Sequence, residues 1–295
     1  MVNLSGGLKF DEIARVVEEN EQVELGDAAA EKIARSFSFL DSFAEKKVIY
    51  GINTGFGPMA QYRVDDDHLR ELQFNIIRSH SCGAGRPLHN RFVRAAMLSR
   101  LSNFAQGRSG ISPQLAELLV AFLNNEIYPV VPEHGGVGAS GDLVQMAHIG
   151  LGLIGEGIVS YKGTYMPASE AMKDCGLDPL EIKIREGLAI ANGTSVMSGI
   201  ASVNLFYAEK LFRWSLLASV MMNEIAESYD DFVSEPLAIS RPHNGQVFVA
   251  EQMREHFKTS ARLRKREHYL YSGKNDERIF EHKVQGYYSL RCVPQ

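Results

Sequence analysis

The sequence has few cysteines, and none of them lies in a metal-binding pattern. Cys82, Cys175 and Cys292 are odd in number and far apart in the chain. The absence of a Cys-x-x-Cys pair or a Cys/His cluster argues against a disulfide framework and a zinc site, and favours reduced thiols. The N-terminus also lacks a basic segment followed by an apolar one, as a secretory signal would require. We therefore expect a cytoplasmic protein.

Long apolar runs and an excess of one charge are absent as well. The longest uncharged stretch, 187–208, contains polar residues such as Asn192, Thr194 and Asn204, which do not suit the interior of a bilayer. Lys and Arg number 31 against 36 Asp and Glu, so the net charge is −5. This balance gives no reason to expect a nucleic acid or an anionic membrane as partner.

The 295 residues are 45% hydrophobic, and their dominant period is helical. Met97, Leu101 and Phe104 lie on one face of a predicted helix, and a longer apolar pattern predicts a helix over 196–225 that is buried on most sides. Strand signals are few: a short run at 48–50, and a hairpin over 158–166 that turns at Lys162-Gly163. The pattern predicts a mainly α protein with a small mixed region.

Two familiar motifs are matched only in part. Gly150, Gly152 and Gly155 have the spacing of a dinucleotide-binding loop, but the preceding residues predict a helix and not the required strand. We expect these glycines to allow close helix packing instead. Ser140 lies in Gly-Ala-Ser-Gly-Asp, in which Asp142 replaces the last glycine of a nucleophile elbow. A serine hydrolase that uses Ser140 with His148 or His80 remains an alternative.

The segment 135–142, Gly-Gly-Val-Gly-Ala-Ser-Gly-Asp, is unusually rich in small residues. One interpretation is a flexible turn in which Asp142 caps the next helix. A second interpretation is chemical. The nitrogen of Gly141 has no bulky neighbour, so it can attack the carbonyl of Ala139 and close a five-membered ring. Loss of water from Ser140 then leaves an exposed methylidene, which is a strong electrophile.

Five segments in order resemble the aromatic amino acid ammonia-lyase family over the whole chain, among them the Ala-Ser-Gly loop. The others are Tyr-Gly-Ile-Asn-Thr-Gly-Phe-Gly (50–57), Ser79-His80 with Arg100…Asn103 and Ser-Gly-Ile (109–111), Asn-Gly-Thr (192–194), and Gln-Gly-Tyr-Tyr-Ser-Leu-Arg (285–291). The resemblance implies a 4-methylidene-imidazole-5-one (MIO) formed from Ala139, Ser140 and Gly141, and no dissociable cofactor. Such a group supplies an electron sink for elimination of ammonia from an amino acid.

The resemblance also assigns roles to other residues. Tyr50 corresponds to the catalytic base, and Asn192 to a residue that hydrogen-bonds near the prosthetic group. Gly57 and His80 are expected at the substrate, His80 at its ring. Ser79-His80 is the pair found in histidine ammonia-lyases. The sequences of 48–62 and of the Ala-Ser-Gly loop, however, resemble a branch of the family that contains tyrosine-active members. Both L-histidine (to urocanate) and L-tyrosine (to p-coumarate) therefore remain open, as does an aminomutase.

The last matched segment supplies three further site residues. Arg291 is expected to bind the substrate carboxylate as a fork. Gln285 is expected to position the amine, with Tyr288 as a catalytic residue. If the segment is helical, the three fall within an arc of about 120°.

The resemblance implies an N-terminal domain over 1–193 with the Ala-Ser-Gly loop and, over 194–295, the beginning of a central helical bundle. Since the sequence ends directly after the last motif, we expect a truncated chain that lacks the rest of the bundle. The family also implies a homotetramer whose active sites combine residues from different subunits. A catalytically inert fragment that merely associates is therefore a further alternative.

Overall fold

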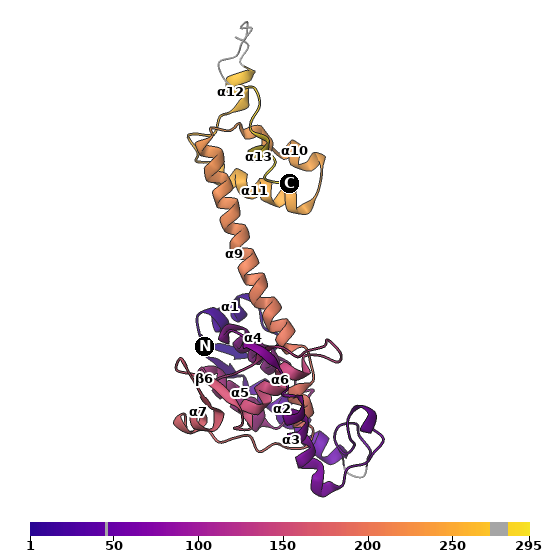
Figure 1. Ribbon diagram of the computed structural model, residues 1–295. Helices are drawn as coiled ribbons and strands as arrows, with labels where there is room; N and C mark the ends of the chain where they lie inside the picture. Colours follow the sequence, from indigo (N-terminus) through magenta and orange to yellow (C-terminus); the bar gives the residue numbers. More distant parts are fainter. Residues whose placement is uncertain (45–46, 272–282) are drawn as a thin grey trace. The chain divides into compact units, whose positions relative to one another are not determined.

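The computed structural model describes residues 1–44, 47–271 and 283–295. The chain divides into two compact units, Met1–Phe206 and Tyr207–Gln295, and the long helix α9 (Ser195–Ile225) contributes residues to both. The protein is mainly helical, as the sequence predicts (Figure 1). None of the helices in the described ranges is both long enough and apolar enough to cross a membrane.

The first unit combines helices with short strands. Its helices before α9 are α1 (Phe10–Glu18), α2 (Asp27–Ala44), α3 (Leu69–His80), α4 (Asn90–Phe104), α5 (Pro113–Asn124), α6 (Leu143–Leu153), α7 (Ala168–Asp174) and α8 (Glu186–Ala191), with 3-10 turns at Gly57–Met59 and Asp66–His68. Its strands are β1 (Val2–Leu4), β2 (Val23–Leu25), β3 (Ala84–Pro87), β4 (Tyr128–Pro129), β5 (Pro132–His134), β6 (Ile158–Tyr161) and β7 (Thr164–Pro167). β1 pairs in parallel with β2, β3 antiparallel with β5, and β6 lies between β4 and β7.

The core of this unit lies on α4 and α5. The predicted stripe of Met97, Leu101 and Phe104 is fully buried on α4. α5 begins at a strong start signal, since the hydroxyl of Ser112 accepts the N–H of Leu115 at 3.3 Å and Pro113 takes the first helical position. The two helices pack against each other.

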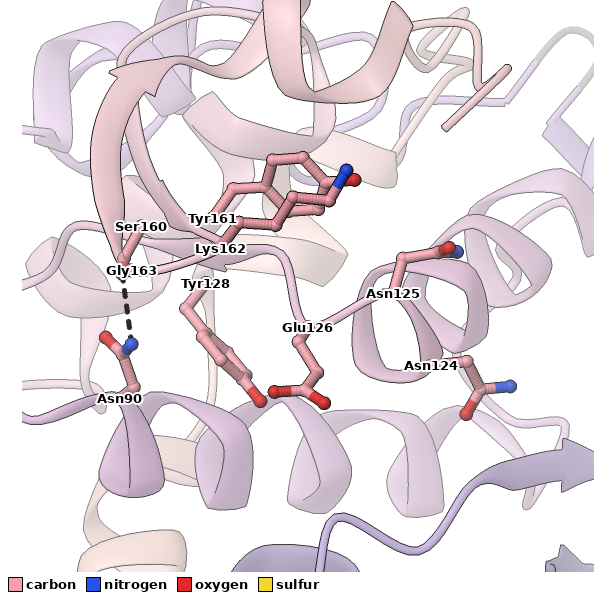
Figure 2. Close-up of a pocket in the computed structure, with 9 residues that line it drawn as sticks. All are labelled: Asn90, Asn124, Asn125, Glu126, Tyr128, Ser160, Tyr161, Lys162 and Gly163. Carbon is pink, nitrogen blue, oxygen red and sulfur yellow. Dashed lines mark hydrogen bonds between the residues drawn. The ribbon is translucent and has the colours of Figure 1, made fainter. Parts of the chain in front are cut away.

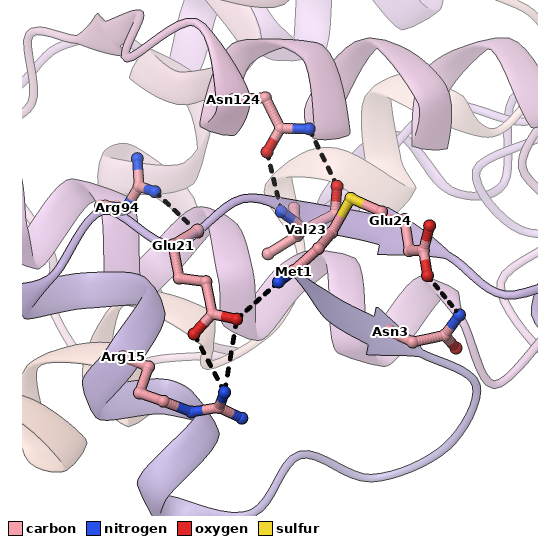
Figure 3. A network of polar contacts seen from close by, with 8 residues as sticks. All are labelled: Met1, Asn3, Arg15, Glu21, Val23, Glu24, Arg94 and Asn124. Atoms are coloured by element: carbon pink, nitrogen blue, oxygen red, sulfur yellow. Dashed lines mark hydrogen bonds and ion pairs between the residues drawn. The ribbon is translucent and has the colours of Figure 1, made fainter.

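Arg94 fastens α4 to the N-terminal segment (Figure 3). Its side chain is 1% exposed and donates to the carbonyls of Val16 at 2.6 Å, Leu123 at 2.7 Å and Glu21 at 3.2 Å, and to the hydroxyl of Tyr128 at 3.0 Å. A buried charge is tolerated when its donors are satisfied in this way. Arg94 therefore serves the fold.

Asn124 makes a second tie to the same segment. Its side-chain oxygen accepts the N–H of Val23 at 2.8 Å, and its side-chain nitrogen donates to the carbonyl of Val23 at 2.9 Å (Figure 3). The two bonds continue the edge of β2 onto the end of α5. Short strands such as β1 and β2 need support of this kind, because a pair of three-residue strands is not stable by itself.

Two of the sequence predictions for this unit are confirmed. β6 and β7 form the predicted hairpin, and its turn at Lys162 and Gly163 has positive φ at both residues. Gly150 and Gly152 lie in helix α6, whereas Gly155 follows the helix with a φ of 77°, so the prediction of close helix packing does not hold for Gly155. A Cβ on Gly150 would come within 3.1 Å of Ile190, and one on Gly152 within 2.7 Å of Pro129, so these glycines allow close packing.

The strand predicted at 48–50 is not formed. Val48 is 70% exposed, and the backbone there turns around the side chain of Asn53. This side chain accepts the N–H of Ile49 at 2.8 Å and donates to the carbonyl of Lys47 at 2.5 Å. A side chain that takes up backbone groups in this way replaces the ladder of a neighbouring strand.

The second unit contains α10 (Glu235–Ser240), α11 (Asn244–Phe257), α12 (Arg266–Leu270), α13 (Tyr288–Arg291) and a 3-10 turn at Asp230–Val233. Its small core combines the later part of α9 with the turn and α11, through Leu216, Val220, Phe232, Val233, Met253 and Phe257. The prediction that 196–225 is helical is confirmed. The prediction that this helix is buried on most sides is wrong for this chain: Leu211, Trp214 and Met221 are 69%, 63% and 53% exposed. A helix that is apolar on most sides needs partners on most sides. The described residues of the second unit cover only the side of α9 that carries Leu216 and Val220.

Candidate active site

The Ala-Ser-Gly loop precedes helix α6 and has a left-handed backbone at several residues. Gly138, Ser140 and Gly141 have φ angles of 69°, 62° and 106°. For Ser140, which carries a Cβ, such an angle costs on the order of 1 to 3 kcal/mol and is typical of functional positions. The conformation bends the chain at the residue whose two neighbours would have to react with each other.

Gly141 lies directly against Gly193 of the Asn-Gly-Thr segment. A Cβ on Gly141 would overlap the carbonyl oxygen of Gly193 and lie 2.9 Å from its carbonyl carbon. The N–H of Asp142 donates to the same carbonyl at 2.7 Å. Only glycine fits at position 141, which also leaves its nitrogen unhindered. The small side chains, the bend at Ser140 and this bare nitrogen fit a ring formed from residues 139–141.

Asp142 is the N-cap residue of helix α6, as one interpretation of the sequence holds, but its side chain makes no capping hydrogen bond. Its carboxylate instead accepts the N–H of Met197 at 2.8 Å, in the first turn of α9. A negatively charged hydrogen-bond acceptor is stabilised at the N-terminal end of a helix. The loop is thereby joined to α9 as well as to Gly193.

Arg100 lies in this region and belongs to the matched Arg100…Asn103 segment, for which the resemblance implies no role. It is 5% exposed, and a Cβ on Gly193 would lie 2.8 Å from Nη1 and 3.0 Å from Cζ of its guanidinium. Nε and Nη2 are buried and have no hydrogen-bond partner among the described residues. Burial lowers the pKa of Arg100 to about 10, against the opposing effect of the Asp142 charge, so the side chain is a cation at neutral pH.

Tyr50 and Gly57 are in contact, as residues of one site should be. The phenol of Tyr50 accepts the N–H of Gly57 at 3.2 Å and meets the ring of Phe56 edge to face. Gly57 has a φ of 53°, which presents its N–H to the phenol. Tyr50 is 54% exposed, so a ligand can reach its hydroxyl. A donor aimed at this oxygen stabilises negative charge that forms there.

The loop that follows Tyr50 is anchored on α3 and α8. Gln73 of α3, which is fully buried, donates to the carbonyl of Gly51 at 3.1 Å and accepts the N–H of Leu188 at 3.3 Å. A Cβ on Gly51 would come within 2.6 Å of the Leu188 side chain. Asn192 follows Leu188 by four residues and is the C-cap of α8, with its N–H donating to Leu188 at 2.9 Å. The Tyr50 loop and the exposed Asn192 are therefore supported by the same short helix.

His80 ends helix α3 and has a defined orientation. Its Nδ1 lies 2.9 Å from the carbonyl oxygen of Ile76 and 3.1 Å from the hydroxyl of Ser79. Because a carbonyl oxygen only accepts, the bond to Ile76 requires a proton on Nδ1, and in that tautomer of the neutral ring Nε2 is the acceptor. Ser79 and Ile76 thus hold the imidazole ring in one orientation.

His148 cannot activate Ser140 in the way that a serine hydrolase needs. Its Nε2 accepts the N–H of Gly83 at 3.1 Å, and burial lowers its pKa. A neutral imidazole has one acceptor nitrogen, and Gly83 already uses it. Within the ranges that the structure describes, Ser140 makes no hydrogen bond to His148 or His80. The geometry therefore gives the hydrolase alternative no support.

The remaining predicted residues belong to the second unit. Tyr288 and Arg291 lie on α13, with the guanidinium of Arg291 5.6 Å from the centre of the Tyr288 ring. Gln285 precedes this helix, so the arc proposed for a continuous helix through all three residues is wrong. The chain is already in an extended conformation at Tyr287, with φ −63° and ψ 131°. Helical geometry can relate only Tyr288 and Arg291.

A pocket of about 420 Å³ lies away from these residues in the first unit (Figure 2). It is lined by amides and hydroxyls from α4, the end of α5 and the β6–β7 hairpin: Asn90, Asn124, Asn125, Glu126, Tyr128, Ser160, Tyr161, Lys162 and Gly163. None of the predicted site residues contributes to its wall. Two of its polar side chains already bond within the protein, Asn90 to Ser160 at 3.0 Å and Lys162 to Asp174 at 2.7 Å.

Comparison with known proteins tests the resemblance found in the sequence. The family model for aromatic amino acid lyase matches residues 8–295. The chain belongs to the aromatic amino acid lyase family. It is 37% identical to a probable histidine ammonia-lyase of Thermoplasma volcanium over 100% of this chain and 57% of that protein. It is 39% identical to a histidine ammonia-lyase of Deinococcus radiodurans over 99% of this chain and 54% of that protein.

A similar solved structure is that of a tyrosine aminomutase from Streptomyces globisporus, with a TM-score of 0.91 and 31% identity. The match covers 99% of this chain and 57% of that one. The recognition of the family from its motifs is thus confirmed, and so is the mainly helical fold. The chain spans little more than half the length of the relatives that it matches.

Proposed function

We propose that the protein eliminates ammonia from an aromatic amino acid, with L-histidine as the first candidate substrate and urocanate as its product. The observation that carries this proposal is the packing of Gly141 against Gly193 beside the left-handed Ser140, in a loop of small residues. Such packing suits an electrophile made from residues 139–141. The names of the curated relatives favour histidine, and a tyrosine aminomutase among the similar structures keeps L-tyrosine and p-coumarate as the second candidate.

The prosthetic group that the family implies would be held by Ala139, Ser140 and Gly141, and it would supply an electron sink that labilises the substrate amine. The chain's own residues do the remaining work. Tyr50 takes the β-proton of the substrate, while the Gly57 N–H stabilises the charge on its oxygen. The electrons of that C–H bond form the new double bond, and the C–N bond breaks with its electron pair on ammonia. No oxidant or reductant is needed.

Binding of the substrate requires three kinds of contact. Nε2 of His80 accepts a hydrogen bond from the ring, because Nδ1 is bonded to Ile76. Arg291 binds the carboxylate, and Gln285 and Tyr288 position the amine. Asn192, at the end of α8 beside the loop, supplies a donor near residues 139–141. We further propose that the site works in a homotetramer, since Ala139, Ser140 and Tyr50 are exposed in the single chain and a lyase must exclude water.

The test combines the mass of a peptide with the ultraviolet spectrum of the product, and both are measured with the full chain. A peptide that spans Ala139–Gly141 should weigh less than its sequence by two water molecules. Incubation with L-histidine or L-tyrosine should produce an α,β-unsaturated acid that absorbs in the ultraviolet. Ser140→Ala is the matched control, because it removes the hydroxyl that leaves as water and adds no bulk. A β-amino acid as product would identify an aminomutase, and an unmodified loop in an active protein would refute the proposal.

A further inference from the structure

Arg100 is a buried cation with unused hydrogen-bond donors. Its side chain is 5% exposed, and Nε and Nη2 lack partners within residues 1–44, 47–271 and 283–295. The centre of the Phe104 ring lies 5.6 Å from Cζ of Arg100. Buried polar groups without partners are rare in native structures, and each calls for an explanation. For Arg100 the explanation lies in what surrounds it.

The guanidinium lies against the residue that supports the Ala-Ser-Gly loop. Gly193 contacts Arg100 so closely that a Cβ there would lie 2.8 Å from Nη1. Gly193 also contacts Gly141, where a Cβ would lie 3.0 Å from the Gly193 nitrogen. Because neither Gly193 nor Gly141 has a side chain, the Arg100 guanidinium can contact Gly193, and Gly193 can contact Gly141.

The same guanidinium faces a charge of opposite sign. Asp142 follows Gly141 directly, and its carboxylate interacts electrostatically with Arg100. This carboxylate bonds to the N–H of Met197, and the N–H of Asp142 bonds to the carbonyl of Gly193. Arg100 therefore interacts with two residues that adjoin Gly141. It contacts Gly193, which packs against Gly141, and it attracts the carboxylate of Asp142, the next residue in the chain.

We propose that Arg100 is a positioning residue for the closure of the ring from Ala139, Ser140 and Gly141, an inference that rests on the proposed function. Arg100 holds the Gly193 peptide against Gly141 and fixes Asp142, so that the Gly141 nitrogen faces the Ala139 carbonyl. Its positive charge stabilises the negative charge that forms on the Ala139 oxygen during the attack.

The step balances without any co-reactant. The nitrogen of Gly141 bonds to the carbonyl carbon of Ala139. The carbonyl oxygen leaves as water with the hydrogens of the Gly141 and Ser140 nitrogens, and a double bond forms between the Ser140 nitrogen and the Ala139 carbon. A second water takes the hydroxyl of Ser140 and the hydrogen on its Cα. No atom is oxidised or reduced overall.

The experiment follows ring closure and not turnover. The protein is synthesised in a short pulse, and the mass of the peptide spanning 135–142 is recorded over time for the wild type, Arg100→Met, Arg100→Lys and Arg94→Lys. We expect the wild type and Arg94→Lys to lose two water molecules at similar rates. Arg100→Met should close about tenfold more slowly, a modest loss for a group that acts through its neighbours. Arg100→Lys should restore part of the rate, because it retains the charge without the planar group.

The outcomes separate this inference from the proposed function. If the wild type never loses two water molecules, the proposed function fails. If the wild type and a folded Arg100→Met close at the same rate, the role of Arg100 is refuted and the proposed function stands. Circular dichroism reports whether each variant folds. If Arg100→Met does not fold, the rate of ring closure in Arg100→Lys decides whether Arg100 has the proposed role. Failure of both to fold would make Arg100 a structural residue like Arg94 and would also refute the inference.

Discussion

Helix α4 carries two buried arginines, and the regions around them differ. Arg94 lies in the region of the N-terminal strands, with four hydrogen bonds to three carbonyls and one phenol. Figure 3 shows the bond to Glu21. Arg100 lies in the region of the Ala-Ser-Gly loop, where Nε and Nη2 have no partner that the described chain provides. The first charge is solvated by the fold, and the second is kept at a cost in stability of about 1 to 3 kcal/mol for each unpaired group. The comparison teaches that burial alone does not tell a structural arginine from a functional one.

Replacement of each arginine by methionine is the strongest test of this difference. Arg94→Met leaves three carbonyls and a phenol without their donor, so we expect it to lower the free energy of unfolding by about 3 to 5 kcal/mol. Arg100→Met removes a buried charge of which Nε and Nη2 are already unpaired among the described residues, so its stability should lie within about 1 kcal/mol of the wild type or above it. Urea denaturation of both variants measures the two values. Equal losses would abolish the comparison.

Gly141→Ala tests whether the loop region holds its conformation as firmly as the strand region does. The added Cβ would meet the Gly193 carbonyl, at a residue with a φ of 106°. We expect a loss of about 3 kcal/mol, the upper end of the range for a side chain held at such an angle, because the contact adds to the strain. Thermal unfolding gives the value, and Gly138→Ala is the matched control. Gly138 also has a positive φ, 69°, but nothing lies within 4 Å of its Cβ position, so its loss should be smaller. Identical losses would show that strain alone, without contact to Gly193, sets the cost.

The sequence predicts much of the loop region and little of this contrast. Helical periodicity places Met97, Leu101 and Phe104 on one buried face, and the hairpin follows from Lys162-Gly163. The crowd of small residues at 135–141 indicates unusual chemistry because a turn does not need four glycines. Arg100 offers a signal that is easy to miss: it follows Met97 by three residues and so lies on the same buried face. Nothing in the sequence indicates which buried arginine finds acceptors, since those of Arg94 are backbone carbonyls distant along the chain.

Other features depend on contacts that periodicity does not contain. The apolar pattern of α9 predicts its helix correctly, but whether Leu211 and Trp214 are covered depends on partners that an amphipathic pattern does not name. The strand expected at 48–50 is replaced by a turn because the Asn53 side chain takes the local backbone groups. At 285–291 the spacing suits a helix, but the helix begins at Tyr288 and leaves Gln285 outside it. Spacing indicates which residues can share a face, and tertiary contacts decide where the helix begins.

Asn124→Ala tests the second tie of the strand region. The variant removes both hydrogen bonds to Val23, and the strand would then expose its N–H and carbonyl to water. We expect the free energy of unfolding to fall by about 1 to 2 kcal/mol, because the bonds are only partly buried. Asn125→Ala is a matched control, since Asn125 bonds only the carbonyl of Ala121 in its own helix, at 2.9 Å. Ring closure at the loop should be unchanged in both variants. Slower closure in Asn124→Ala would mean that the two regions are coupled.

The smallest effect concerns pH and belongs to the loop region. Burial lowers the pKa of His148 below its ordinary value of 6.5, while its Nε2 accepts the Gly83 N–H. The unfolded chain therefore binds a proton at a higher pH than the folded chain does. The stabilisation is complete above about pH 6.5 and is lost as the pH falls through the folded pKa. The melting temperature of the wild type should fall as the pH is lowered from about 6.5 through the folded pKa. The melting temperature of His148→Gln, which keeps an acceptor for the Gly83 N–H, should fall less. A parallel decline in both proteins would assign the effect to other groups. A difference between them would show that α6, the helix that follows the Ala-Ser-Gly loop, loses stabilisation when its histidine becomes charged.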